Sequence, residues 1–396
     1  MALNPFTYDD PVSPQELIDR SEVLVKLLEL AEGGHNTRLQ APRRYGKTSV
    51  LLKLCQEAET AGFRTIYVDF MLATTPAEIA RRIEEAYLRA LKGPLGQMFG
   101  RMRRTWKGRL KAAPGGVGAE LEYGADSDAT QRLADLLDLP LRVLETTGER
   151  TIVVFDEFQD FLRAEGKLDG LLRSKIQHHG DAASYIFSGS EQALLEEYFN
   201  SRKRPLFDQA RPIYLDPLDS VDLGDYIASR FSATGKDSGE ILDLLLGIAR
   251  GHPQRAMLLA HHLWEATDDG GVATEDTMDR SLEQIDRETK ERFEGTWQAI
   301  AGTANKRRTL KALALSDETL YNQRTLRRFK LSKGQAQSGE RGLISSGEVV
   351  RVDGRATIVD PLLERWIQVQ DSSPAAKPAP EDPDDARRAT HGGALR

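Results

Sequence analysis

The octet Ala41-Pro42-Arg43-Arg44-Tyr45-Gly46-Lys47-Thr48 has the spacing of a phosphate-binding P-loop, with alanine in the place of the first glycine. A loop that opens a helix directs unpaired backbone N–H groups at an anion, and the helix N-terminus adds positive potential. Gly46 allows the backbone to approach phosphate oxygens, the ammonium group of Lys47 can reach the β- and γ-phosphates, and Thr48 offers a hydroxyl group to Mg²⁺. The octet therefore predicts a nucleotide-binding site.

The residues around the octet have the pattern that such a loop requires. Thr37-Arg38-Leu39-Gln40 can form a strand before it, and Thr48 to Glu57 carries the apolar spacing of a helix after it. A chance match within a basic loop is the competing interpretation, and a second motif further along the chain argues against it.

This second motif is Thr151-Ile152-Val153-Val154-Phe155-Asp156-Glu157. A β-branched apolar run that ends in two carboxylates is typical of a buried parallel strand that presents acids at the carboxyl edge of a sheet. We expect Asp156 to complete the Mg²⁺ shell opposite Thr48, and Glu157 to polarise a water for in-line attack on the γ-phosphate. An ordinary strand with a helix-capping Asp-Glu pair would look the same alone, but not as the partner of a P-loop in this order.

Composition limits the class of protein. With 396 residues, 40% of them hydrophobic, the chain is long enough for two or three globular domains. Its net charge of -7 gives no argument for a nucleic-acid partner, so any such site would be a local basic patch. A single cysteine, Cys55, excludes an internal disulfide and fits a reducing compartment. There is no run of about 18 apolar residues and no signal-peptide pattern, so we expect a cytoplasmic protein without membrane contact.

Short apolar runs alternate with helical patterns over the first half of the chain. This alternation predicts an α/β domain over residues 1–218, with a parallel sheet and helices on both faces. The expected strands are Arg38 to Ala41, Arg64 to Phe70, Thr151 to Asp156, Ser184 to Ser188 and Pro212 to Leu215.

A long excursion, residues 92–128, separates the second and third of these strands. It ends in a glycine-rich piece, residues 114–118. A basic stretch interleaved with aromatic residues could follow a phosphate backbone, but a solvated insertion is the favoured interpretation. The basic and aromatic residues of the excursion are Phe99, Arg101, Arg103, Arg104, Trp106, Lys107, Arg109 and Lys111.

Residues 219–295 are expected to form a helical lid over the nucleotide. Ile241 to Trp264 has a strong helical pattern that is interrupted by Gly251-His252-Pro253. A pair of helices with a Gly-x-Pro joint suits such a lid.

Residues 296–370 predict a winged helix, and residues 371–396 predict a disordered tail. The first segment combines helical patterns at Lys306 to Leu315 and Leu320 to Leu331 with a hairpin around Asp353-Gly354. The tail is rich in proline and in charged residues.

Taken in order, these motifs resemble those of the archaeal-type ATPases in the AAA+/STAND branch of the P-loop NTPases. The resemblance covers residues 4–369. The segments that carry it are Asn4-Pro5-Phe6, Asp19-Arg20-Ser21-Glu22, Pro42 to Ser49, Asp156 to Gln159, Phe187 to Ser190, Gly251 to Pro253 and Asp360-Pro361-Leu362.

The resemblance implies an ASCE-type sheet, in which the acid-bearing strand is not adjacent to the P-loop strand, together with a helical lid, a winged helix, and ATP with Mg²⁺ as the ligand. It implies that Ser190, or Ser188, senses the γ-phosphate, and that Glu157, Lys47 and Ser190 are catalytic. Thr48 and Asp156 would hold the metal. The nucleotide-binding residues would be Pro42, Arg43, Arg44, Tyr45, Gly46, Lys47, Thr48 and Ser49 around the phosphates, with Pro5, Phe6, Ile18, Arg20 and Pro253 near the adenine.

The role of the expected winged helix is open from the sequence. Gly334 and Gly339 lie in the segment that would enter a DNA groove, and each costs about 1 kcal/mol in a helix. This favours a domain that clamps the nucleotide domain over one that reads DNA.

The favoured function is therefore a slow Mg²⁺-dependent ATPase that acts as a conformational switch, with ATP and ADP as ligands. One alternative is a DNA-binding regulator or adaptor that binds ATP with little turnover. Another is an oligomeric ATPase that acts on DNA, with a trans-acting arginine at Arg202, Arg204 or Arg211. The sequence identifies neither a DNA nor a protein partner, and it is compatible with a monomer or a nucleotide-dependent oligomer.

Overall fold

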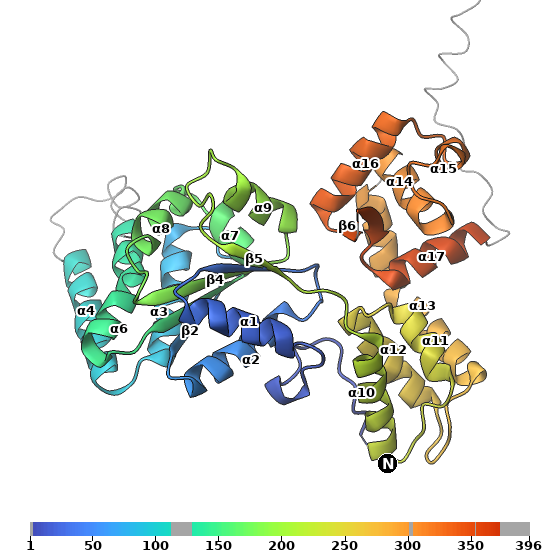
Figure 1. Cartoon of the computed structure of the whole chain (residues 1–396), viewed down its shortest axis with the longest axis horizontal. Coiled ribbons are helices and arrows are strands. Elements are labelled where there is room, and N and C mark those ends of the chain that lie inside the picture. Colours follow the sequence, from blue (N-terminus) through green and yellow to red (C-terminus); the bar gives the residue numbers. More distant parts are fainter. Residues whose placement is uncertain (1–2, 112–128, 301–303, 353, 373–396) are drawn as a thin grey trace, which may run out of the picture.

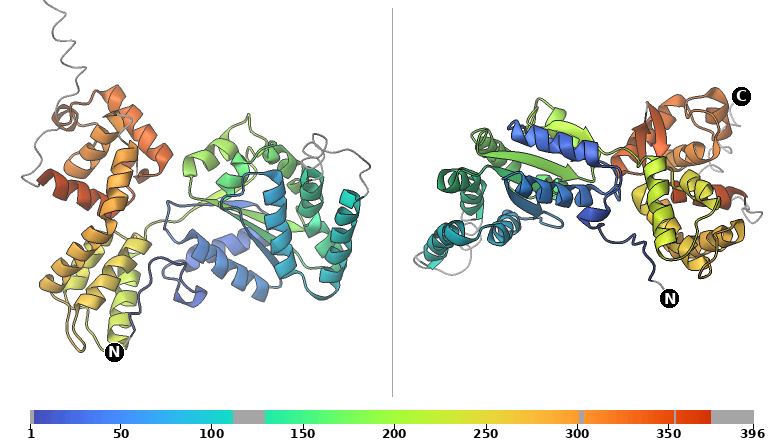
Figure 2. Two further views of the ribbon diagram at one scale, coloured as in Figure 1. Left: turned by 180° about the vertical axis from the view of Figure 1, so that it is seen from behind. Right: turned by 60° about the horizontal axis from the view of Figure 1, so that its bottom comes forward.

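The computed structural model describes residues 3–111, 129–300, 304–352 and 354–372 (Figure 1). Residues 112–128 of the expected insertion and nearly all of the expected tail therefore lie outside the described residues. We call residues 3–218 the sheet lobe, 219–300 the helical lobe and 304–372 the C-terminal lobe. The sheet lobe lies on one side of the molecule, and the other two lobes lie together on the opposite side (Figures 1 and 2).

The sheet lobe is built on a five-stranded sheet in the order β2-β3-β4-β1-β5, in which all neighbours are parallel. Strand β4 lies between β1 and β3, so the acid-bearing strand is not adjacent to the P-loop strand, as predicted. The strands are β1 (Thr37–Gln40), β2 (Arg64–Asp69), β3 (Thr151–Asp156), β4 (Ala183–Gly189) and β5 (Arg211–Tyr214).

Helices cover both faces of this sheet because successive side chains of each strand point to opposite faces. In β3, Ile152 and Val154 belong to one hydrophobic cluster, whereas Val153 and Phe155 belong to another. The first cluster includes residues of α1 (Ser21–Glu32) and α2 (Lys47–Thr60). The second includes residues of α3 (Pro76–Ala90), α4 (Gly93–Lys111), a helix at 129–137, α6 (Leu139–Thr147), α7 (Phe158–Arg163), α8 (Leu168–Ile176) and α9 (Gln192–Asn200).

The helical lobe contains α10 (Ser220–Ala233), α11 (Ile241–Ala249), α12 (Pro253–Ala266) and α13 (Glu275–Ala299). The joint between α11 and α12 contains Gly251, which has a φ of 71°. A β-carbon there would lie 2.5 Å from the carbonyl oxygen of Leu218. Glycine is thus required for the close approach of this joint to the segment that leaves the sheet.

The C-terminal lobe consists of helices followed by an antiparallel hairpin and a last helix. Its core is continuous with that of the helical lobe, since one cluster contains Leu258 of α12, Phe293 of α13 and Leu362 of the last helix. The elements are α14 (Ala304–Leu315), α15 (Gln323–Arg328), α16 (Lys333–Ser346), β6 (Val349–Val352), β7 (Arg355–Ile358) and α17 (Pro361–Ser372).

Helix α16 corrects the argument from glycine content, because the segment with Gly334 and Gly339 is a regular helix. Ser332 caps it, accepting a hydrogen bond from the backbone N–H of Gln335, whose side chain accepts from the N–H of Ser332. Gly339 faces α14, where a β-carbon would lie 2.7 Å from the carbonyl oxygen of Asn305. Capping and close helix packing therefore outweigh the low helix propensity of glycine.

Candidate functional site

The predicted P-loop connects β1 to α2 and curls over the N-terminus of that helix. Gly46 is the N-cap residue, with a φ of 82°, a conformation that favours glycine. Lys47 is buried, and its ammonium group donates to the carbonyl oxygens of Ala41 at 3.0 Å and Pro42 at 2.9 Å. Burial lowers the pKa of Lys47 to about 8, against the opposing influence of Glu157 and Asp156. The sequence thus places a desolvated cation at the centre of the loop.

The two predicted metal ligands are in direct contact. The hydroxyl group of Thr48, in the first turn of α2, donates to Oδ2 of Asp156 at 3.1 Å. Tyr67 of β2 donates its phenolic hydrogen to the same oxygen at 2.6 Å, and burial together with the Asp156 charge raises the pKa of Tyr67. A hydroxyl and a carboxylate at the end of a phosphate loop suit Mg²⁺, which keeps waters and phosphate oxygens as its other ligands. Tyr67 was not singled out from the sequence.

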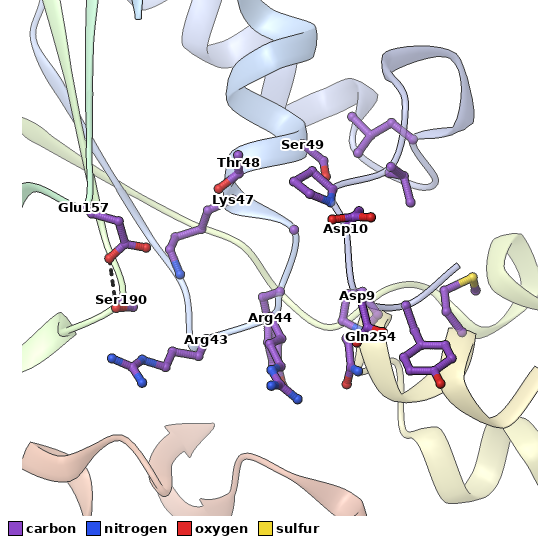
Figure 3. A pocket seen from close by; sticks show the side chains of 18 of the residues that line it. Asp9, Asp10, Arg43, Arg44, Lys47, Thr48, Ser49, Glu157, Ser190 and Gln254 are labelled. Atoms are coloured by element: carbon purple, nitrogen blue, oxygen red, sulfur yellow. Dashed lines mark hydrogen bonds between the residues drawn. The ribbon is translucent and has the colours of Figure 1, made fainter. Parts of the chain in front are cut away.

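Glu157 and Ser190 also meet, although they follow different strands. Glu157 has a φ of 48° and turns from β3 into α7. The hydroxyl group of Ser190, just beyond β4, donates to Oε2 of Glu157 at 3.3 Å (Figure 3). The carboxylate predicted to be the base and the predicted sensor are therefore joined.

Gln159 holds this pair in place, and sequence analysis missed it. Its buried side-chain amide donates to Oε2 of Glu157 and, at 3.5 Å, to the hydroxyl oxygen of Ser190. A β-carbon at Gly189 would collide with the Gln159 amide oxygen, so glycine at the end of β4 leaves room for this amide. The one sequence feature that could have indicated this role is the position of an amide residue two places after the strand-end glutamate.

A cavity of about 620 Å³ extends from these residues to the helical lobe. Of the predicted residues, Arg43, Arg44, Tyr45, Gly46, Lys47, Thr48, Ser49, Glu157, Ser190, Ile18, Arg20 and Pro253 line it. Pro42 and Asp156 do not belong to its wall. The far end is formed by residues that the sequence did not single out, namely Thr7 to Val12, Leu218, Tyr226, Gln254 and Met257.

Pro5 and Phe6 also lie outside the cavity wall. Phe6 is buried in the core of the helical lobe, with its ring 5.5 Å from that of Phe231. Its carbonyl oxygen is 2.8 Å from Nδ1 of His261. Phe6 thus anchors the N-terminal segment, and the residues after it pass along the cavity.

Arg20 is buried at the junction of the lobes. It donates to the carbonyl oxygen of Asp216 at 2.8 Å, and burial lowers its pKa while Asp19 and Asp216 oppose the shift. The charge of Arg20 therefore also fixes the segment that leaves β5.

The P-loop touches the joint of the helical lobe. The ring of Tyr45 packs edge-on against that of His252, with the centroids 4.9 Å apart. Arg43 and Arg44 extend away from α2, toward the C-terminal lobe (Figure 3). A change in the conformation of the P-loop would therefore act directly on the α11–α12 joint through this contact.

No protein-family model and no curated protein sequence matches the chain. Among solved structures, the Walker-type ATPase PABY2304 of Pyrococcus abyssi is similar, with a TM-score of 0.63, 18% sequence identity, and coverage of 92% of this chain and 99% of that chain. The ORC2 protein of Aeropyrum pernix in its ADPNP–ADP complexes is also similar, with a TM-score of 0.55, 15% identity, and coverage of 92% and 98%.

At these identities the likeness concerns the fold. It confirms the predicted fold class: a parallel sheet with helices on both faces, as in the P-loop NTPase fold. Within the described residues, no helix combines the length and the apolar content needed to span a membrane.

Proposed function

We propose that the protein binds ATP with Mg²⁺, hydrolyses it, and uses the cycle to change the arrangement of its lobes. One observation carries this proposal: the hydroxyl group of Thr48, which with the buried Lys47 lines a cavity of about 620 Å³, contacts the carboxylate of Asp156 at 3.1 Å. This volume lies within the ordinary range for small-molecule sites, about 300–1,000 Å³. The two similar structures support the choice of nucleotide, since one is an ATPase and the other holds ADPNP and ADP.

The phosphates would lie at the loop and the adenine at the far end of the cavity. Backbone N–H groups at the start of α2, together with the Lys47 ammonium, suit the triphosphate. At the far end, Ile18, Pro253 and Met257 offer apolar contacts to a flat base. Mg²⁺, held by Thr48 and Asp156, would neutralise charge on the β- and γ-phosphate oxygens.

Hydrolysis would depend on Glu157. Its carboxylate would accept a proton from, or orient, the attacking water, while the hydroxyl group of Ser190 donates to this carboxylate at 3.3 Å. The Gln159 amide keeps the carboxylate in one orientation, because it donates to the same oxygen as Ser190 does. Gln159 is thus a positioning residue in this proposal.

The lobes offer a route by which the nucleotide state would alter the conformation. Tyr45 of the P-loop packs on His252, next to the hinge glycine Gly251. The helical and C-terminal lobes would move as one body, because they share a core and are joined by ion pairs of Arg250 with Glu364 and of Arg365 with Asp286, at 2.6 and 3.0 Å. Helix α16 lies beside α9 of the sheet lobe, where a clamp would act.

The substitution Glu157→Gln tests the catalytic part of the proposal. It keeps the shape and hydrogen bonding of the side chain but removes the base, so ATP should still bind while hydrolysis falls by about 10²-fold or more. A fluorophore pair on α9 and α16 should then report one stable distance with ATP and another with ADP. Hydrolysis at the parental rate would exclude Glu157 as the base, and an unchanged distance in both states would exclude the switch.

A DNA-binding regulator with little turnover remains the second candidate, and helix α16 favours it. This helix is capped and regular, and it exposes Lys333, Gln337 and Arg341 at a spacing of four residues, along one face. Fluorescence anisotropy with duplex DNA, together with ATPase rates with and without DNA, separates the candidates. Tight DNA binding by a protein without turnover would replace the switch as the better account.

A further inference from the structure

A second cavity, of about 540 Å³, shares Arg43, Arg44, Ser190 and Glu191 with the nucleotide cavity. The rest of its wall comes from Pro42 and Gln192 of the sheet lobe and from the helical and C-terminal lobes. Arg255 at the start of α12 and Arg292 of α13 also line it. We call this space the arginine cavity. Its wall includes Ser190 but neither Lys47 nor Glu157, so it adjoins the phosphate end of the nucleotide site.

Most of these guanidinium groups form no direct ion pair within the described ranges 3–111, 129–300, 304–352 and 354–372. Arg255 forms an ion pair with Asp360, whereas Arg43, Arg44 and Arg292 form none there. Burial, followed by the positive charge of Arg255, lowers the pKa of Arg292 to about 10, with Asp360 opposing the shift. Like charges are therefore gathered around this cavity, with Arg255 buried and Arg43, Arg44 and Arg292 exposed.

The carboxylates on the wall do not balance this charge. Asp360 is shared between Arg255 Nε, at 2.8 Å, and the N-terminus of α17, where it accepts from the backbone N–H of Leu362 at 3.0 Å. Glu191 pairs with Arg163, which lies outside this cavity. Burial raises the pKa of Glu348, so its surroundings disfavour the charged form. The arginine cavity thus has an excess of positive charge.

Arg255 adds a direct sign of a missing acceptor. Its side chain is 2% exposed, and Nη1 has no hydrogen-bond partner among the residues described. A buried donor without an acceptor costs free energy, about 1–3 kcal/mol and more for a charged group, so such donors are usually satisfied. Arg255 therefore keeps a donor that the surrounding residues leave unsatisfied.

We propose that the arginine cavity binds a small phosphate-bearing anion between Arg43 and Arg44 of the P-loop and the arginines of α12 and α13, apart from Lys47 and Thr48. Phosphate oxygens can accept hydrogen bonds from several planar guanidinium groups at once. A carboxylate is less suited to bind more than two arginines in this way. The anion would join the loop residues Arg43 and Arg44 to α12 and α13, and so would stabilise the closed arrangement of the lobes. The phosphate comes either from a free inorganic ion or from a nucleotide.

Calorimetry on the full-length protein distinguishes these sources. With the P-loop site filled by excess ADP and Mg²⁺, inorganic pyrophosphate titrated as its magnesium complex should show one further binding event. If a nucleotide is the ligand, ADP alone should bind with two equivalents, and pyrophosphate should compete with the second. Either result supports the site.

The decisive variant is Arg292→Ala, because Arg292 lines the arginine cavity but not the nucleotide cavity. It should weaken the additional event at least tenfold and leave the first ADP equivalent unchanged. Arg292→Lys keeps the charge without the planar fork and should give an intermediate loss. The control is Arg287→Ala on the same helix, whose exposed side chain pairs with Glu283, and it should change nothing.

The proposal is overturned if ADP binds with one equivalent and pyrophosphate shows no event in its presence. It is equally overturned if folded Arg292→Ala binds the second anion as tightly as the parent does. Neither result affects the assignment of the P-loop site, because the first equivalent of ADP reports on that site separately.

Discussion

The imidazole ring of His252 offers a pH test of the joint between the P-loop and the helical lobe. The ring is 3% exposed and packs against Tyr45, and its Nδ1 accepts a hydrogen bond from the backbone N–H of Arg255 at 3.4 Å. Burial lowers the pKa of His252 from 6.5 to about 4; Asp360 opposes this shift, and the charges of Arg255 and Arg44 add to it. The folded protein thus keeps this ring neutral under mildly acidic conditions.

The size of the effect follows from the two pKa values. Between pH 6.5 and pH 4 the unfolded chain binds a proton at His252 that the folded chain does not bind. The free energy of unfolding therefore falls as the pH decreases through this window. The stability contributed by keeping the His252 ring neutral is fully present above pH 6.5. Linkage gives a loss of about 2 kcal/mol between pH 7 and pH 5 from this one group.

Urea unfolding of the parent and of His252→Asn measures this loss. Asparagine can still cap α12, but it does not titrate, while the other histidines are common to both proteins. Tryptophan emission, with Trp264 and Trp366 in the two packed lobes, follows the transition. From pH 7 to pH 5 the parent should lose about 2 kcal/mol more than the variant. Equal losses, or a His252 ring signal that titrates near pH 6.5 by NMR, would refute the argument.

Three further substitutions test separate parts of the account. Thr48→Ala should act through the metal, so its loss of ATP affinity should shrink when ATP is titrated without Mg²⁺. Gln159→Leu removes the donor that orients Glu157, and hydrolysis should fall about tenfold with ATP affinity unchanged; an unaltered rate would remove Gln159 from the mechanism. Gly339→Ala places a β-carbon against α14, and thermal unfolding should show a loss of about 1–3 kcal/mol.

The sheet and the phosphate end of the site could be predicted because local sequence determines them. A β-branched run that ends in Asp156 and Glu157 is a buried strand with its acids at the sheet edge. The loop between β1 and α2 carries its own positive-φ glycine and its own lysine. Strand β3 has the expected bounds, and the ends of β1, β2, β4 and β5 differ from expectation by no more than one residue, since residues at strand ends gain little from pairing.

The rest depends on contacts between distant segments. Tyr67 and Gln159 reach the site only after strands far apart in sequence have paired. The residues next to Tyr67 and Gln159 in the sequence give no indication of their contacts with Asp156 and Glu157. The helix with Gly334 and Gly339 was misjudged because propensity counts each glycine as a loss, whereas α14 requires a close approach at Gly339. Phe6 likewise lies in a core to which residues 218–367 contribute, which no local pattern reveals.

Binding of Mg·ATP to the parent and to Lys47→Ala is the most direct test of the central claim, that this cavity is a nucleotide site. Lys47 is the buried cation of the loop, with its ammonium group 3.0 Å from the Ala41 carbonyl oxygen, and no other side chain of the octet can replace it there. Isothermal titration calorimetry should show one equivalent of ATP for the parent and at least tenfold weaker binding for the variant, about 1.4 kcal/mol. A folded Lys47→Ala protein that binds Mg·ATP with the parental affinity would contradict the account.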